Sequence, residues 1–253
     1  MSDDLSAPQD QDMNEQLVLI TGDSGAGKSA SLRNLSNQEN WLYLNCEVGK
    51  RLPFRNRFKQ TKIEDPFWLY SAFDACQNEP SVLGVIIDTI TMNMDAFEDM
   101  YIKTAEDTRA AWGEYGTYLR TLMREKIQPF GKPVLILAHR TQVYDEKKME
   151  LSYRCDIKGA VGKGKGFESM FSTVINARKV DLKELEEHPG QLLTITDEDK
   201  YLGFKHVFQV HPTKDTRTDR IRTPMGLFPR NEPFMDNDAA LLLTQLNDYY
   251  GND

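Results

Sequence analysis

Short apolar runs alternate with amphipathic stretches along most of this chain. Runs that are almost continuously apolar are typical of strands buried on both faces of a parallel sheet. The sequence predicts four such strands, at residues 17–21, 41–45, 82–88 and 134–138. Three further strands are predicted later in the chain, at residues 171–180, 192–196 and 204–210.

Helical periodicity fills much of the chain between and after these runs. In residues 103–127 apolar side chains recur at intervals of three and four, the spacing of one helix face. These positions are Ala111, Tyr115, Tyr118, Leu119 and Leu122. Pro129 and Gly131 end this helix. Two more helices are predicted at residues 28–35 and 237–249, the second capped by Asp236 or Asn237.

This order of elements predicts an α/β fold with a mostly parallel, twisted sheet flanked by helices and a C-terminal β-hairpin region. Because we find no repeat and no linker, we expect residues 16–253 to form a single domain. Residues 1–15 are polar and acidic, and we expect a disordered tail there. Residues 141–166 are too long for an ordinary connection, so we expect a functional loop or a partly disordered segment.

Composition narrows the function only slightly. The chain has 253 residues, 40% of them hydrophobic, and a net charge of −8. This charge argues against a general coat of nucleic acid, but a local basic loop can still bind phosphates. With no apolar run long enough to cross a bilayer and no secretory signal, we expect a cytoplasmic protein without a membrane partner. The three scattered cysteines fit a reducing compartment.

Residues 22–29 carry the chemistry that the sequence indicates most clearly. Gly-Asp-Ser-Gly-Ala-Gly-Lys-Ser follows an apolar strand and opens a predicted helix, as in the phosphate-binding loop G-x-x-x-x-G-K-[ST]. Its glycines allow backbone angles at which successive amides point toward phosphate oxygens. Lys28 can reach the β- and γ-phosphates, and Ser29 can bind Mg²⁺. We expect a nucleoside triphosphate to be bound by Gly22, Asp23, Ser24, Gly25, Ala26, Gly27, Lys28 and Ser29.

Three residues at predicted strand ends complete the candidate site. Asp88 ends an apolar strand and is expected to hold Mg²⁺ together with Ser29. Glu47 follows the second strand, where it could orient and deprotonate an attacking water. His139 ends the fourth strand and could sense the γ-phosphate. A plain turn aspartate, a solvated glutamate and a strand-capping histidine are the alternative interpretations.

In this order, the phosphate loop and the strand ends at Glu47, Asp88 and His139 resemble the core of RecA-like P-loop ATPases. More closely, residues 17–250 resemble the phage-encoded, AAA_24-like ATPases of the Sak type, which are implicated in single-strand DNA annealing and recombination. The resemblance implies ATP and Mg²⁺ as cofactors and Glu47 as the catalytic base. His139 stands where RecA-type proteins have a glutamine.

The resemblance also implies DNA-binding loops after the third and fourth core strands, at residues 90–106 and 141–166. Candidate nucleic-acid contacts in the second loop are Arg154, Lys158, Lys163 and Lys165, beside aromatic residues that suit base stacking. Acidic residues dilute this charge, so a solvated loop is the alternative.

A basic residue from a neighbouring subunit completes the nucleotide site of oligomeric RecA-like ATPases. The matching segment here carries Lys214, Arg217, Arg220 and Arg222, of which we favour Arg217. The alternative is a basic turn that touches no partner.

Together these expectations describe a Mg²⁺-dependent, DNA-stimulated ATPase that acts on single-stranded DNA in phage-type recombination, annealing or replication, in the host cytoplasm if phage-encoded. We expect a homo-oligomeric ring or filament, with a single-strand-binding protein as a further candidate partner. One alternative is a small-molecule kinase, although the sequence lacks an obvious arginine-rich lid. The other is a DNA-binding or loader module that binds the nucleotide without hydrolysing it.

Overall fold

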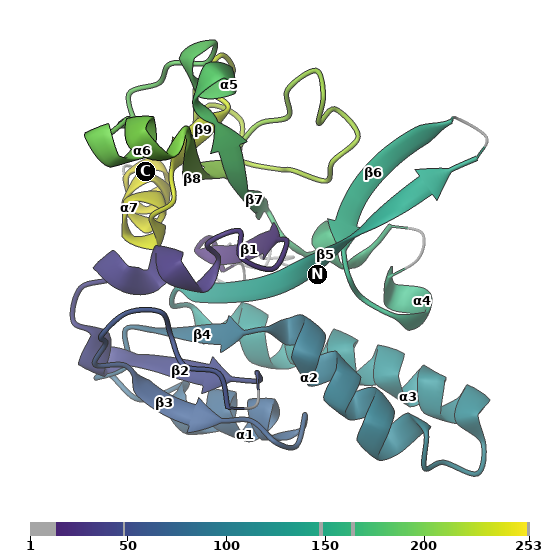
Figure 1. Cartoon of the computed structure of the whole chain (residues 1–253). Coiled ribbons are helices and arrows are strands. Elements are labelled where there is room, and N and C mark those ends of the chain that lie inside the picture. The colour runs from purple at the N-terminus through teal and green to yellow at the C-terminus, as the bar shows by residue number, and fades with distance from the viewer. Residues whose placement is uncertain (1–13, 48, 147–148, 163–164, 252–253) are drawn as a thin grey trace, which may run out of the picture.

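A computed structural model describes residues 14–47, 49–146, 149–162 and 165–251 of the chain (Figure 1). Its strands are β1 (Leu17–Gly22), β2 (Trp41–Asn45), β3 (Lys59–Lys62), β4 (Gly84–Asp88), β5 (Val134–Asp145), β6 (Glu150–Cys155), β7 (Thr173–Asp181), β8 (Phe204–Gln209) and β9 (Phe234–Asp236). Its α-helices are α1 (Trp68–Cys76), α2 (Ile90–Phe97), α3 (Thr108–Thr121), α4 (Gly159–Gly162), α5 (Leu182–Glu186), α6 (Asp197–Leu202) and α7 (Ala239–Tyr250). Further helical turns are η2 (Ser29–Asn34), η3 (Gln38–Asn40), η4 (Glu98–Ile102), η5 (Leu122–Ile127), η6 (Gln128–Phe130) and η7 (Phe167–Met170).

The strands form one sheet in the order β3-β2-β4-β5-β1-β7-β8-β9, and β6 pairs with the outer half of β5. From β3 to β7 all pairings are parallel, whereas β8 and β9 run antiparallel to their neighbours. The predicted fold class is therefore confirmed: a mostly parallel sheet with an antiparallel C-terminal region.

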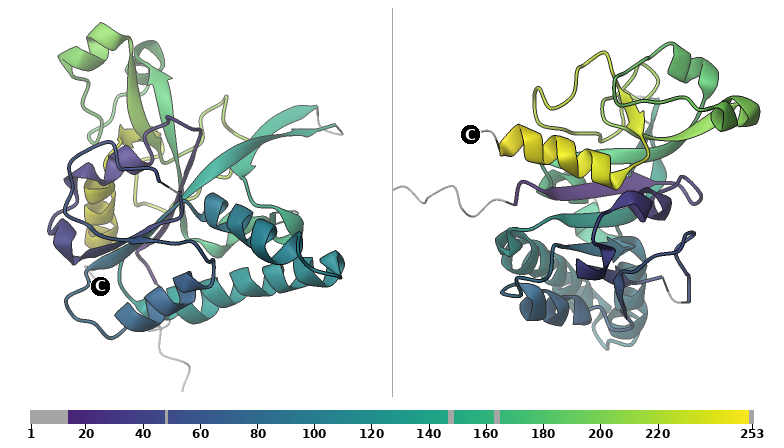
Figure 2. Two further views of the ribbon diagram at one scale, coloured as in Figure 1. Left: turned by 60° about the horizontal axis from the view of Figure 1, so that its bottom comes forward. Right: turned by 90° about the vertical axis from the view of Figure 1, so that its left-hand side faces the viewer.

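Two hydrophobic cores cover the two faces of this sheet, because alternate side chains of each strand point to opposite faces. Leu19 and Ile136 face the layer that contains α1, α2 and α3. Ile20 and Leu135 face the opposite layer, which contains η2 and α7. The right-hand view of Figure 2 shows the yellow α7 and the blue helices on opposite sides of the sheet. The central strands are buried on both faces, as their apolar sequence predicts.

The carboxyl ends of the central parallel strands position the candidate site. The phosphate loop follows β1, Glu47 follows β2, Asp88 ends β4, and His139 lies in β5 next to Ala138. Gly22 and His139 are partners in the β1–β5 register, and Asn45 and Asp88 are partners in the β2–β4 register. Residues from four separate strands therefore meet at one edge of the sheet.

Several predicted elements differ in the structure. The described part of residues 141–166 includes the outer half of β5, β6 and α4, and is not one long loop, because β5 continues beyond the sheet and pairs with β6. Residues 90–106, the first predicted DNA-binding loop, begin with α2 and η4, which pack Met94 and Phe97 into the core. Residues 192–196 form no strand; their backbone is held by Asp236 through Leu192 and Thr194.

Helix boundaries also shift. The helix predicted from residue 103 begins at Thr108. Its cap is Asp107, whose carboxylate accepts hydrogen bonds from the backbone amides of Arg109 and Ala110. After the phosphate loop the chain forms the short 3₁₀ helix η2 and not an α-helix. The last helix is capped by Asp238, whose Oδ1 accepts from the amides of Ala240 and Leu241, and not by Asp236 or Asn237.

Of the predicted N-terminal tail, residues 1–13 lie outside the described part. Asn14 is buried, and its Nδ2 donates to the Lys132 carbonyl at 2.9 Å. Within the described residues, no helix has the length and apolar character needed to cross a membrane.

Candidate nucleotide-binding site

The glycines of the phosphate loop are needed for different structural reasons. Gly25 and Gly27 have φ angles of +75° and +96°, which residues with a side chain rarely adopt. Gly22 has no positive φ; a Cβ there would lie 2.6 Å from the carbonyl oxygen of Ala177 in β7. Gly22 is therefore needed because β1 and β7 approach closely where the loop begins.

Lys28 lies folded back into the loop. Its Nζ donates to the carbonyls of Gly22 and Asp23 at 2.9 and 3.0 Å and lies 3.4 Å from Nδ1 of His139. The residue is 6% exposed. Burial lowers the pKa of Lys28 to about 8, although the carboxylates of Asp88 and Glu47 oppose this shift. An anionic phosphate at this position would favour the charged ammonium.

Ser29 and Asp88 are in direct contact. Oγ of Ser29 donates to Oδ2 of Asp88 at 2.7 Å, and the Tyr43 hydroxyl donates to the same oxygen at 2.8 Å. Oδ1 of Asp88 is buried and has no hydrogen-bond partner among the described residues. Burial raises the pKa of Asp88. An unsatisfied carboxylate oxygen beside a serine hydroxyl matches the oxygen donors that Mg²⁺ takes, so these residues fit that ion.

Glu47 and His139 extend this group. Nε2 of His139 lies 3.4 Å from Oε1 of Glu47, and Lys50 forms an ion pair with the other carboxylate oxygen. The hydrogen bond from His139, followed by the contact with Lys50, lowers the pKa of Glu47 to about 2. Glu47 is therefore ionised at neutral pH. Such a carboxylate accepts hydrogen bonds well but is a weak proton acceptor.

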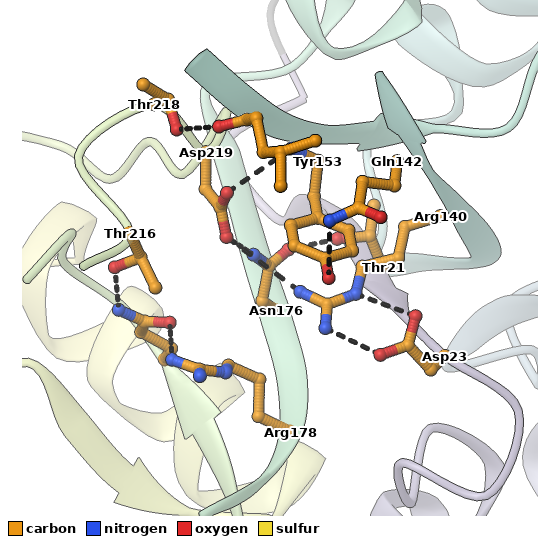
Figure 3. A network of polar contacts seen from close by, with 12 residues as sticks. Thr21, Asp23, Arg140, Gln142, Tyr153, Asn176, Arg178, Thr216, Thr218 and Asp219 are labelled. Atoms are coloured by element: carbon orange, nitrogen blue, oxygen red, sulfur yellow. Dashed lines mark hydrogen bonds and ion pairs between the residues drawn. The ribbon is translucent and has the colours of Figure 1, made fainter. Parts of the chain in front are cut away.

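A polar network links the phosphate loop to the hairpin (Figure 3). Nε and Nη2 of Arg140 donate to the two carboxylate oxygens of Asp23 at 3.0 and 2.6 Å. The guanidinium stacks on the ring of Tyr153 with a separation of 4.1 Å and lies 3.8 Å from Asp219. The hydrogen bonds that Arg140 donates to Asp23 lower the pKa of the Asp23 carboxyl group.

Asp219 continues the network toward β1. It accepts from the backbone amide of Tyr153 at 3.3 Å and from Nδ2 of Asn176 at 3.3 Å, and Asn176 in turn is hydrogen-bonded to Thr21. Thr21 immediately precedes the phosphate loop. Three segments that are distant in the sequence, namely β1, β6 and residues 213–222, are thus joined through Arg140 and Asp219.

The predicted DNA contacts have different surroundings. Lys158 is paired with Asp95 of α2 at 2.7 Å and Glu98 of η4 at 2.5 Å, which fixes the start of α4 against these two helices. Arg154 is half-buried in β6, Lys165 is exposed, and Lys163 lies outside the described residues.

The basic segment at residues 214–222 lies against the hairpin. Nη2 of Arg217 donates to Glu150 of β6 at 2.7 Å, and Oγ1 of Thr218 donates to the Leu151 carbonyl at 2.7 Å. Arg220 contacts Glu168, and Arg222 contacts the Phe171 carbonyl. Lys214 is exposed. Arg217 is thus engaged within its own chain, although its side chain is 70% exposed.

A cavity of about 880 Å³ contains the loop from Ser24 to Ser29, together with Glu47 and His139. It continues past the phosphate loop to residues of α6, β8 and the β9–α7 junction. This volume lies in the range of small-molecule sites. Sequence reasoning missed Tyr43, Arg140 and the junction residues. Arg140 could have been noticed as the neighbour of His139, whereas the junction residues carry no motif.

The loop, the Ser29–Asp88 pair and the glutamate at the next strand end together define a P-loop NTPase. A family model described as an AAA domain (AAA_24) matches residues 14–212. The chain belongs to this family of P-loop NTPases. A search of curated proteins found no match.

Proposed function

We propose that the protein is a Mg²⁺-dependent ATPase that hydrolyses ATP to ADP and phosphate and acts on single-stranded DNA. The observation that carries the ATPase assignment is the convergence of Lys28, Ser29 and Glu47 in one cavity, with Asp88 hydrogen-bonded to Ser29 directly behind it. Membership of the AAA domain family supports it. The narrower identity, a Sak-type ATPase in phage recombination, annealing or replication, rests on the resemblance of the motifs.

In this proposal each residue has a defined task. The loop amides and Lys28 hold the β- and γ-phosphates, while Ser29 and Asp88 hold Mg²⁺, which neutralises phosphate charge when bound. Lys28 must then release the two loop carbonyls that now hold it. Glu47 orients the attacking water by accepting a hydrogen bond from it, a task that suits its low pKa better than full proton removal. His139 contacts both Lys28 and Glu47 and can report the presence of the γ-phosphate.

We further propose that nucleotide binding changes DNA affinity through β5 and Arg140. His139 and Arg140 are consecutive residues of β5, one at the phosphate site and the other at the base of the hairpin. Figures 1 and 2 show the hairpin projecting away from the helices. Arg154 and Lys165 are the preferred phosphate contacts, with Tyr153 and Tyr144 as stacking residues. Lys158 is a weaker candidate because two carboxylates already neutralise it.

In an oligomer, Arg217 of one subunit would complete the site of the next. It would first have to leave Glu150, which at this exposed position costs little free energy. A ring or filament and contact with a single-strand-binding protein belong to the same proposal.

The test is an ATP hydrolysis assay with and without single-stranded DNA on four proteins: wild type, Lys28→Ala, Glu47→Gln and the control Glu187→Gln. Glu187 is exposed and outside the cavity. Wild type and control should hydrolyse ATP and respond to DNA, Lys28→Ala should lose nucleotide binding, and Glu47→Gln should bind ATP but turn over at least about 100-fold more slowly.

Unchanged turnover in Glu47→Gln would mean that Glu47 does not orient the water. Absence of hydrolysis in wild type with retained ATP binding would favour the loader alternative. Phosphate transfer to a small acceptor, without any effect of DNA, would favour the kinase.

A further inference from the structure

The cavity extends well beyond the part that phosphates would occupy. Its far end is lined by Arg33 and Asn34 of η2, Leu202 of α6, and residues of the β9–α7 junction, which includes Asn237. This junction lies outside residues 14–212, the part that the family model matches. If the phosphates lie at Lys28 and Ser29, as the proposed function requires, this far end offers space for the sugar and base.

Two hydrogen bonds hold the junction against η2. The carbonyl of Asn237 accepts from Nη1 of Arg33 at 2.7 Å, and Oδ2 of Asp238 accepts from Nδ2 of Asn34 at 2.6 Å. Both donors belong to η2, the helix that follows the loop. Asn237 is therefore placed by the helix that also positions Ser29.

The carboxamide of Asn237 lies directly beside the loop. A Cβ at Gly27 would be 3.2 Å from its Oδ1 and 3.3 Å from its Nδ2, and 3.3 Å from Nδ1 of His206. His206 is itself fixed, because its Nδ1 lies 3.2 Å from the Ala26 carbonyl. Because Gly27 has no Cβ, the amide of Asn237 can lie against the loop backbone.

This amide carries an unsatisfied donor. Asn237 is 4% exposed, and within the described part of the chain its Nδ2 has no hydrogen-bond partner. Buried polar groups are nearly always paired, because an unpaired donor loses its bonds to water without replacement. A buried amide without a partner in the wall of a ligand cavity is accounted for when the ligand supplies the acceptor.

We propose that Asn237 recognises the nucleoside end of the bound nucleotide, with Nδ2 donating to an acceptor of the sugar or the base. This inference rests on the proposed function. It adds a residue that contacts the nucleoside, the part of the ligand that the phosphate loop does not bind. It makes the C-terminal segment beyond the family match part of the nucleotide site. A purely structural asparagine at this position would instead stabilise the protein whether or not nucleotide is present.

The experiment compares ATP with inorganic tripolyphosphate, which has the phosphates but no nucleoside. Binding of each is measured by titration and by the ligand-induced rise in melting temperature. The variants are Asn237→Leu, which is close in size but has no donor, Asn237→Ala, and Asn247→Ala as control. Asn247 is exposed on α7. Lys28→Ala reports on the phosphate end.

For Asn237→Leu and Asn237→Ala we expect ATP to bind about five- to tenfold more weakly, the effect of one lost hydrogen bond, and tripolyphosphate to bind as in wild type. Without ligand, Asn237→Leu should melt at the same temperature as wild type or higher, because it removes an unsatisfied buried donor. Asn247→Ala should bind both ligands normally, and Lys28→Ala should lose both.

Unchanged ATP affinity in both Asn237 variants would overturn the inference while leaving the proposed function intact. So would an equal loss of ATP and tripolyphosphate, or a lower melting temperature of ligand-free Asn237→Leu, since either would mark Asn237 as a structural residue. If wild type binds neither ligand, the proposed function fails and this inference fails with it.

Discussion

The two halves of β5 are held in place by different forces. The inner half, Val134–Ala138, lies between β1 and β4 and is buried on both faces. The outer half, Arg140–Asp145, pairs only with β6 and carries the exposed Tyr144 near the hairpin tip. His139 lies between them. Hydrophobic burial fixes the inner half, whereas polar contacts of Arg140 fix the base of the outer half, so one strand joins a rigid core to a more adjustable ribbon.

This difference has a functional consequence in the proposed mechanism. A core strand cannot move by small amounts without creating cavities. A ribbon held by polar contacts, among them the guanidinium of Arg140, can change position when the ion pair between Arg140 and Asp23 changes. The nucleotide site lies at the boundary, where a signal from the phosphate loop would act on the adjustable half.

The largest expected effect is on stability and concerns the inner half. Leu135 is 0% exposed. Leu135→Ala should lower the free energy of unfolding by about 2–5 kcal/mol, the usual range for a large buried side chain. The matched truncation in the outer half, Val143→Ala, should cost about 1 kcal/mol or less, because Val143 is only half-buried. Urea denaturation measures both, and equal losses would contradict the contrast.

The second effect concerns Arg140. Arg140→Ala removes the bidentate pair with Asp23 and leaves Asp219, whose side chain is 3% exposed, without its nearest cation. We expect a loss of about 1–3 kcal/mol, because a buried charged group loses a partner. Amide hydrogen exchange in β6 should increase while exchange in the inner half of β5 stays slow.

Arg124→Ala, which truncates an exposed arginine, is the control for this effect and should be neutral. If amide exchange in the Arg140→Ala variant becomes faster throughout the sheet, Arg140 supports the whole domain and not the hairpin alone.

The third effect is the pH dependence of ATP binding. It concerns Lys28, which contacts His139 at the boundary between the two halves of β5. Its pKa of about 8 in the free protein should rise when phosphate binds, because the anion favours the ammonium. Binding therefore takes up a proton above pH 8, and affinity should fall by up to about tenfold per pH unit there. Below pH 8 this group contributes no pH dependence.

Titrations between pH 7 and pH 10 measure this slope. Lys28→Arg is the matched control, since arginine stays charged over that range. A similar decline in Lys28→Arg would assign the pH dependence to another group.

The sequence predicted the parts of the molecule that depend on local pattern. The apolar runs located β1, β2 and the inner half of β5, and the glycine-rich motif located the phosphate loop. The sequence did not predict the features that depend on contacts between distant segments. The outer half of β5 is polar and glycine-rich sequence follows it, so only its pairing with β6 shows that it is a strand. Likewise, Asn237 reaches Gly27 only because β9 and α7 fold back onto η2.

The smallest effect concerns the proposed DNA contact of the outer half. Arg154 of β6 is half-buried, whereas Lys158 after the hairpin is paired with Asp95 and Glu98. If Arg154 binds a phosphate, Arg154→Ala should make the slope of log affinity against log salt less negative by about 0.7 on single-stranded DNA. Lys158→Ala should leave the slope unchanged, because Lys158 releases no counterion on binding. Equal slopes in wild type and Arg154→Ala, measured by fluorescence anisotropy at several salt concentrations, would remove Arg154 from the proposed interface.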